Sequence, residues 1–97
     1  MSKALGRDVA RALRDSAAAA GAAIDAAVTV ERPWASALFE GTRFTLVLAD
    51  EAAEFGGWLD TLPEADLPLR GHFVASTEVT DRGTATATVE ILAVSEG

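Results

Sequence analysis

The stretch that most constrains the fold is an extended run over residues 32–49. Its second half alternates between two sets of residues, so that one face of a strand is fully apolar and the other nearly so. The first set is Phe44, Leu46 and Leu48, and the second is Thr45, Val47 and Ala49. Glu40-Gly41 stands in the middle, and glycine adopts the positive φ that a tight turn requires. The stretch therefore predicts one long β-hairpin that turns at Glu40-Gly41.

Helical patterns flank this hairpin on both sides. The first predicted helix begins at Ser2 as its N-cap, continues to about Ala20 and stops at Gly21. The second begins at Asp50, which has the side chain of an N-cap, and ends at Pro63. The apolar stripe of this second helix consists of Ala52, Phe55, Leu59 and Leu62. Both helices can therefore pack an apolar stripe against a sheet.

Two further stretches have the alternation of strands. Residues 24–31 precede Pro33, which lacks the amide hydrogen of a strand ladder, so this strand is at an edge or is bulged or broken there. The last third predicts a second hairpin, with a strand over 69–80, a turn at 81–83 and a final strand. Leu92 and Val94 place apolar groups on the outward face of that final strand.

The predicted elements follow the order α-β-β-α-β-β within one α+β domain over residues 1–97. A four-stranded antiparallel sheet with both helices on one face buries their apolar stripes. This is a ferredoxin-like layering in a permuted order. The predicted core consists of Phe44, Leu46, Leu48, Phe55, Leu59, Phe73, Val79, Val89 and Ile91.

Charge and composition argue against several kinds of partner. The net charge is −7, which disfavours non-specific nucleic-acid binding because that binding depends on lysine and arginine at the phosphates. No run reaches the ~18 apolar residues of a membrane-spanning helix. The chain has no cysteine, which excludes disulfides and fits a reducing compartment. We therefore expect a cytoplasmic protein with no nucleic-acid partner and no membrane span.

The sequence offers little for catalysis or metal binding. One histidine and no cysteine exclude the classical zinc sites. Ser76 follows His72 by four residues on a predicted strand, ~13 Å away, which is too far for a nucleophile–base hydrogen bond. The acids at residues 50, 51 and 54 suit a helix N-terminus better than a metal site. We expect no catalytic residues, no metal and no cofactor, and an enzyme is the less favoured class.

Five polar or aromatic residues form the candidate ligand-binding set. They are Arg32, Trp34, Ser36, Arg43 and His72. If the two hairpins lie side by side, these residues converge into a small pocket, where an arginine beside an aromatic ring suits a carboxylate or phosphate. In the alternative, the two arginines pair across the sheet with acids such as Glu31 or Glu40.

The function that these patterns favour is protein–protein interaction or assembly. The core is thin for 97 residues and both sheet faces carry apolar groups, which predicts a homodimer formed by an edge strand or by the second sheet face. The alternative is a small anionic-ligand-binding domain or enzyme that uses Arg32, Trp34, Arg43 and His72. The first helix also has a basic face, which is either solvated or docks an acidic partner. That face consists of Lys3, Arg7, Arg11 and Arg14.

Overall fold

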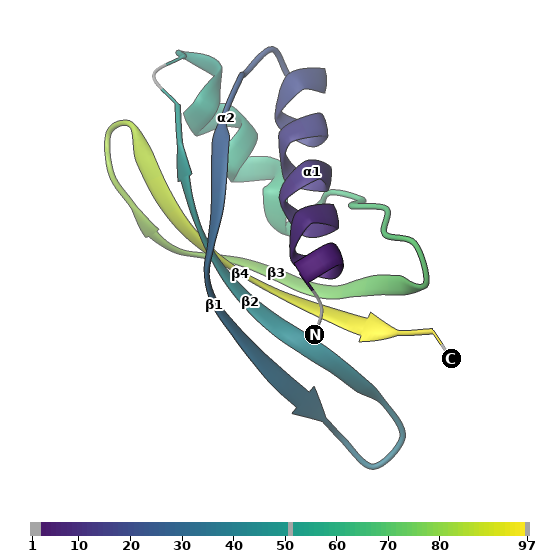
Figure 1. Cartoon of the computed structure of the whole chain (residues 1–97). Helices are drawn as coiled ribbons and strands as arrows, with labels where there is room; N and C mark the ends of the chain where they lie inside the picture. Colours follow the sequence, from purple (N-terminus) through teal and green to yellow (C-terminus); the bar gives the residue numbers. More distant parts are fainter. Residues whose placement is uncertain (1–2, 51, 97) are drawn as a thin grey trace.

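A computed structural model of the protein describes residues 3–50 and 52–96. Within these residues, two α-helices, a short 3₁₀ helix and four strands follow one another (Figure 1). In order they are α1 (Lys3–Ala19), β1 (Asp25–Ala35), β2 (Glu40–Ala49), α2 (Glu54–Thr61), η1 (Leu62–Glu64), β3 (His72–Arg82) and β4 (Thr86–Ser95). Ser2 and Glu51, which the sequence places at helix starts, lie outside the described residues.

The four strands form one antiparallel sheet in the order β1-β2-β4-β3. Both helices lie on the same side of this sheet (Figure 1). The prediction of an α+β fold with a four-stranded antiparallel sheet and two helices is thus confirmed. No helix among the described residues has the length and apolar character needed to cross a membrane.

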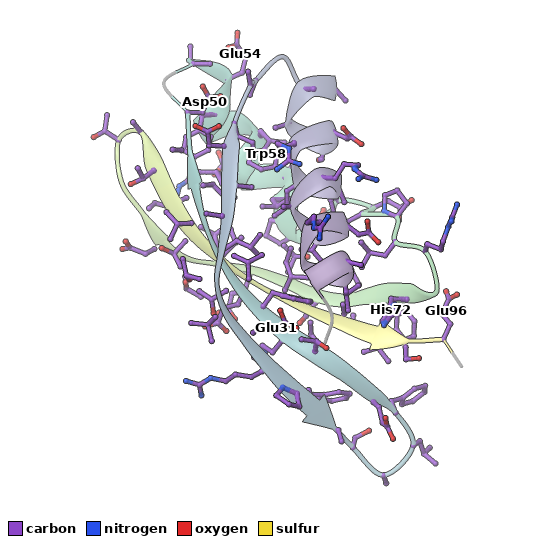
Figure 2. All side chains as sticks on the ribbon, viewed as in Figure 1. Glu31, Asp50, Glu54, Trp58, His72 and Glu96 are labelled. Atoms are coloured by element: carbon purple, nitrogen blue, oxygen red, sulfur yellow. The ribbon has the colours of Figure 1, made fainter. Side chains whose placement is uncertain are left out.

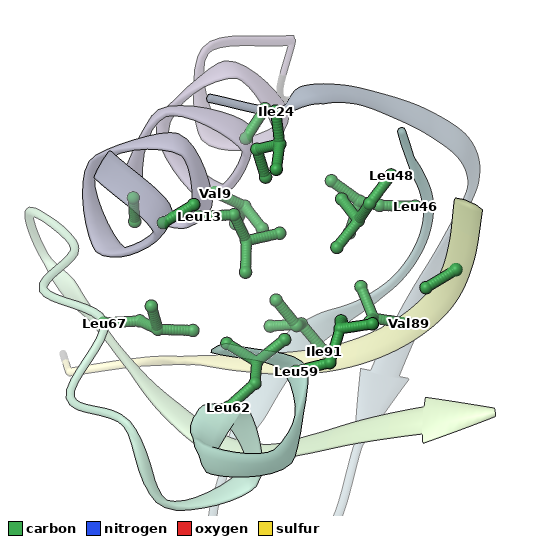
Figure 3. Close-up of a cluster of buried hydrophobic side chains, with 14 of the residues drawn as sticks. Val9, Leu13, Ile24, Leu46, Leu48, Leu59, Leu62, Leu67, Val89 and Ile91 are labelled. Atoms are coloured by element: carbon green, nitrogen blue, oxygen red, sulfur yellow. The ribbon is translucent and has the colours of Figure 1, made fainter. Parts of the chain in front are cut away.

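The core lies between the helices and the two central strands (Figure 3). The alternation in β2 places Phe44, Leu46 and Leu48 inward, where all three are fully buried. Val89 and Ile91 extend this layer along β4. The helices and the segments beside them complete the core with Val9, Leu13, Ala17, Ile24, Phe55, Trp58, Leu59, Leu62 and Leu67.

Gly21 ends α1, as the sequence predicts. Its φ is +89°, a left-handed conformation that favours glycine. The amide of Gly21 donates to the carbonyl of Ala18 at 3.0 Å, and the amide of Ala22 donates to the carbonyl of Ala17 at 2.9 Å. This pair of bonds satisfies helix-end carbonyls and turns the chain toward β1.

The first hairpin turns at residues 36–39, so the predicted turn at Glu40-Gly41 is wrong. Ala35 pairs with Glu40, and the amide of Ser36 donates to the carbonyl of Phe39 at 2.8 Å. Gly41 instead lies within β2, where an added Cβ would collide with the backbone carbonyl oxygen of Ala93. The glycine therefore permits the close approach of β2 and β4 rather than a turn.

β1 is an edge strand, but it continues through Pro33, which pairs with Thr42. The irregularity in the β1–β2 ladder lies between Val28 and Val30. The proline is accommodated because one side of an edge strand has no ladder partner and so requires no amide hydrogen there.

α2 begins at Glu54, and Asp50 does not cap it as predicted. One carboxylate oxygen of Asp50 accepts a hydrogen bond from the amide of Ala52 at 2.9 Å, and the other accepts from the amide of Ala23 at 3.1 Å. Asp50 therefore joins the end of β2 to the segment that enters β1. The Trp58 indole Nε1 donates to the hydroxyl oxygen of Ser16 at 2.9 Å, which ties α2 to α1 (Figure 2).

Two irregularities in β3 change which residues face the helices. The register shifts between Val74 and Ser76 and again between Val79 and Asp81. Phe73 pairs with Val94 on the face away from the helices and is 40% exposed, so the prediction that it is buried is wrong. Val79 does pack against the core but is only partly buried.

Candidate functional site

The sheet face opposite the helices is the candidate functional site, and we call it the open face. Within the described residues, no helix packs on it (Figure 1). Strand register and side-chain alternation define its central residues. They are Val30, Arg32 and Trp34 on β1; Arg43, Thr45 and Val47 on β2; Glu90, Leu92 and Val94 on β4; and Phe73, Ser76 and Glu78 on β3.

One end of the open face is aromatic. The Phe39 ring, from the β1–β2 turn, meets the Phe73 ring of β3 edge to face, with 6.4 Å between the ring centroids. Val94, on the strand between them, is only 2% exposed although none of the described helices lies above it. Phe39 and Phe73 themselves stay 49% and 40% exposed. The open face thus keeps two large aromatic side chains in contact with solvent.

Exposed apolar side chains also occur along the strands toward the other end of the open face. Val47 on β2 is 39% exposed and Val30 on β1 is 37% exposed. Thr45 and Thr88 are their neighbours in the register. The threonines add methyl groups beside hydroxyls, so the middle of the face is semi-apolar, as the alternation in the sequence predicts.

Two like-charge pairs stand on this face. Arg32 lies directly opposite Arg43 across β1 and β2, and we call these two the arginine pair. Glu78 lies directly opposite Glu90 across β3 and β4, and we call these two the glutamate pair. Like charges directly opposite each other on one sheet face destabilise it. The face therefore has a basic half on one hairpin and an acidic half on the other.

Neither pair is neutralised within the described part of the chain. The two ion pairs seen there are Arg82 with Asp60 at 2.7 Å and Arg11 with Asp8 at 3.9 Å. Thus Arg32 and Arg43 do not form the predicted pairs with Glu31 or Glu40.

The five predicted ligand-binding residues do not converge in one pocket. Arg32, Trp34 and Arg43 share the open face. Ser36 lies in the β1–β2 turn, where its hydroxyl oxygen accepts the Phe39 amide at 3.3 Å. His72 begins β3 at the other edge of the sheet, and its Nδ1 lies 3.4 Å from the Arg70 carbonyl oxygen (Figure 2). The arginine pair and Trp34 are thus the part of the set that the fold brings together.

Four cavities among the described residues lie away from the arginine pair and Trp34. The largest of these four, about 640 Å³, lies between α1 and residues 65–70 and is lined by acids and arginines such as Asp15 and Arg70. A second, about 380 Å³, lies between α1 and β1 beside Gly6 and Val28. Two smaller ones adjoin His72 and Phe39. None of these four is lined by Arg32, Trp34 or Arg43.

Phe39, Phe73 and the glutamate pair are not among the site residues predicted from the sequence. The irregular pairing of β3 turns Phe73 to the face opposite to the predicted one, and the displacement of the turn places Phe39 in a loop rather than in a strand. The opposition of Glu78 and Glu90 follows only from the exact register between β3 and β4. The period-two pattern of β4, which places Glu90 beside Leu92 on the outward face, was the available signal.

Groups of three or more possible metal ligands are absent from the described residues. Comparisons of the chain with protein-family models, with curated proteins and with solved structures found no match. The surface of the protein is therefore the guide to its function.

Proposed function

We propose that this protein is a non-enzymatic assembly domain that forms a homodimer through the open face. The observation that carries the proposal is exposed apolar surface on a sheet face that no described element covers, with Phe39 and Phe73 at one end and Val47 toward the other. Apolar surface gains roughly 25 cal/mol for each Å² removed from water. Contiguous exposed apolar patches on a folded protein are typical of interaction sites.

The two edge strands of the sheet are poorly suited to pairing with a second chain, which favours the open face as the interface. β1 carries Pro33, and β3 has two register shifts. Prolines and bulges interrupt the regular ladder that strand addition needs. Of the two dimer modes that the sequence leaves open, packing of the open face is therefore the better supported.

The test is the mass of the protein in solution, with one variant on each face of the sheet. We expect light scattering at micromolar concentration to give twice the chain mass of 10.0 kDa. Val47→Lys should return the mass to that of one chain, because it replaces an exposed apolar side chain of the interface with a charge that would be buried there. Val28→Lys is the matched control, since Val28 is similarly exposed at 37% but lies on the helix side of the sheet.

Two results would contradict the proposal. One is a wild-type mass that stays at one chain as the concentration rises. The other is a dimer that survives Val47→Lys and is lost in Val28→Lys, which would place the interface at the α1–β1 side.

A second candidate function is the binding of a small anion by the arginine pair. The observation that favours it is the juxtaposition of two guanidinium groups beside Trp34, without an ion-pair partner among the described residues. Arginine suits the carboxylate and phosphate groups of such ligands. Saturable phosphate binding by monomeric Val47→Lys protein, lost in Arg43→Ala, would support this function over the first.

We also propose a permuted ferredoxin-like fold and a cytoplasmic location. The strand order β1-β2-β4-β3 supports the first, because it is the order obtained when the initial strand of a β-α-β-β-α-β ferredoxin-like sheet is moved to the C-terminus. The lack of cysteine supports the second.

A further inference from the structure

We infer that the arginine pair of each subunit binds the glutamate pair of the other, so that the homodimer is a charge-matched sandwich of two open faces. This inference rests on the proposed dimerisation and specifies its partner chemistry and orientation. The occupant of the open face is a second copy of this chain. The evidence is the distribution of charge over the four strands.

The first observation is that both pairs are unfavourable in the isolated chain. Arg32 and Arg43 are direct cross-strand neighbours, and so are Glu78 and Glu90. Each arrangement opposes like charges on one sheet face, which is destabilising. Arg43 lies opposite Leu92, two residues from Glu90, but the described residues show no ion pair between Arg43 and Glu90. Charges of opposite sign from outside the chain would neutralise both pairs.

The second observation is the place of each pair in the sheet. In the order β1-β2-β4-β3, the centre lies between β2 and β4. The arginine pair occupies the strands on one side of this centre, and the glutamate pair occupies the strands on the other. A two-fold axis along the strand direction at the centre turns one sheet over onto a second copy. It places β1 and β2 of each subunit over β3 and β4 of the other, so each basic half covers an acidic half.

The geometry of packed sheets permits the contact. Two aligned sheets lie about 10 Å apart, with their strand directions within about 30° of each other. Under this axis Arg43 lies over Leu92 of the partner subunit, and Glu90 of the partner subunit is two residues, or about 7 Å, further along that strand. An arginine and a glutamate side chain together extend far enough to span this diagonal, and Arg32 and Glu78 have the same relation.

The apolar residues give this arrangement its affinity, and the charges give it its orientation. Val30, which is 37% exposed, lies two residues from Arg32 on the open face, and the exposed Val47 and Phe73 lie on the same face. Charged pairs at an interface fix register and exclude wrong partners more than they add affinity. A copy turned the other way would place arginine over arginine.

The experiment reverses the charges of each pair in a separate variant and then mixes the two variants. The first variant carries Arg32→Glu and Arg43→Glu, and the second carries Glu78→Arg and Glu90→Arg. Each variant alone opposes like charges across the interface, and we expect its dimer Kd to rise by roughly 100-fold or more. An equimolar mixture should form a heterodimer, because the acidic faces of one variant meet the basic faces of the other. Native mass spectrometry resolves the heterodimer from either homodimer by mass.

Matched controls change the net charge equally away from the open face. They are Arg7→Glu with Arg14→Glu on α1, and Glu54→Arg with Glu64→Arg near α2. Both controls should stay dimeric on their own. Recovery of a dimer on mixing the open-face variants also proves that each is folded.

The inference is overturned if either open-face variant dimerises as tightly as the wild type, or if the mixture stays monomeric while both variants keep their circular dichroism spectra. A monomeric wild-type protein is a different failure, because it rejects the proposed homodimer itself.

Discussion

Gly41 shows how one residue sets the contact between the two central strands. An ideal Cβ at this position would overlap the carbonyl oxygen of Ala93 and lie 3.0 Å from the Cα of Val94. Both obstacles are backbone atoms of β4, which cannot rotate away as a side chain can. Any residue larger than glycine therefore forces β2 and β4 apart at the aromatic end of the open face.

Gly41→Ala should lower the free energy of unfolding by about 1–3 kcal/mol, the usual cost of overpacking. Gly57→Ala is the control, because no atom lies within 4 Å of its added Cβ. That change should raise stability by up to about 1 kcal/mol, since alanine is the better helix former. Urea denaturation measures both. Equal stability of Gly41→Ala and the wild type would show that the strands adjust without cost.

At the scale of elements, α2 is held by its contacts rather than by its own helix propensity. It has eight residues, includes Gly56 and Gly57, and its N-cap residue Ala53 makes no side-chain cap. A helix this short is unstable in water without tertiary contacts. Phe55, Trp58 and Leu59 supply them, since each is at most 3% exposed.

Phe55→Ala should therefore cost about 3–5 kcal/mol in unfolding free energy, as expected for removing a buried aromatic side chain. Phe39→Ala is the matched control, because the Phe39 ring is half exposed in a turn; its effect should be much smaller when measured on the monomer. Thermal unfolding of each variant in a Val47→Lys background gives this comparison. A Phe55→Ala protein as stable as its parent would contradict the assignment of Phe55 to the core.

The elements also show what the sequence can and cannot predict. Strong periodicity predicts β2 and β4 correctly, because a regular strand places alternate residues such as Leu46 and Val47 on opposite faces. The edge strands depart from period two, since an irregular pairing shifts every later side chain to the other face. Phe73 precedes such a shift and faces outward, whereas Thr77 follows it and faces inward.

Of the residues on the open face, the sequence singles out Arg32, Trp34 and Arg43 as candidates but not the residues that complete the surface. The two arginines, like the two glutamates, are neighbours only because of the register between their strands. Alternation within one strand does not specify that register. Ser36 and His72 are placed outside the open face by the turn at residues 36–39 and by the start of β3. Spacing along the chain gave no measure of the distance between the two hairpins.

At the scale of the whole molecule, the net charge of −7 opposes association while the pattern of charge favours it. Net repulsion acts over the Debye length, which is about 8 Å at physiological salt, so it weakens between the bodies of two subunits. The arginine and glutamate pairs lie within the proposed interface, where screening is weaker. A homodimer of an acidic chain is therefore compatible with its composition.

The proposed dimerisation also predicts a change in stability that can be measured on the wild-type protein. The sheet has helices on one side only among the described elements, so the exposed apolar side chains of the open face would be buried only in the proposed dimer. A folded dimer in equilibrium with unfolded chains becomes more stable as concentration rises, by mass action. For a chain of this size, we expect Tm to increase by roughly 3 °C for each tenfold rise in concentration.

Val47→Lys should unfold at a Tm independent of concentration, and Val28→Lys should keep the dependence. A wild-type Tm that is constant over a hundredfold range would mean that the open face stays solvated, since no other described surface carries both the exposed aromatic rings and the opposed charge pairs.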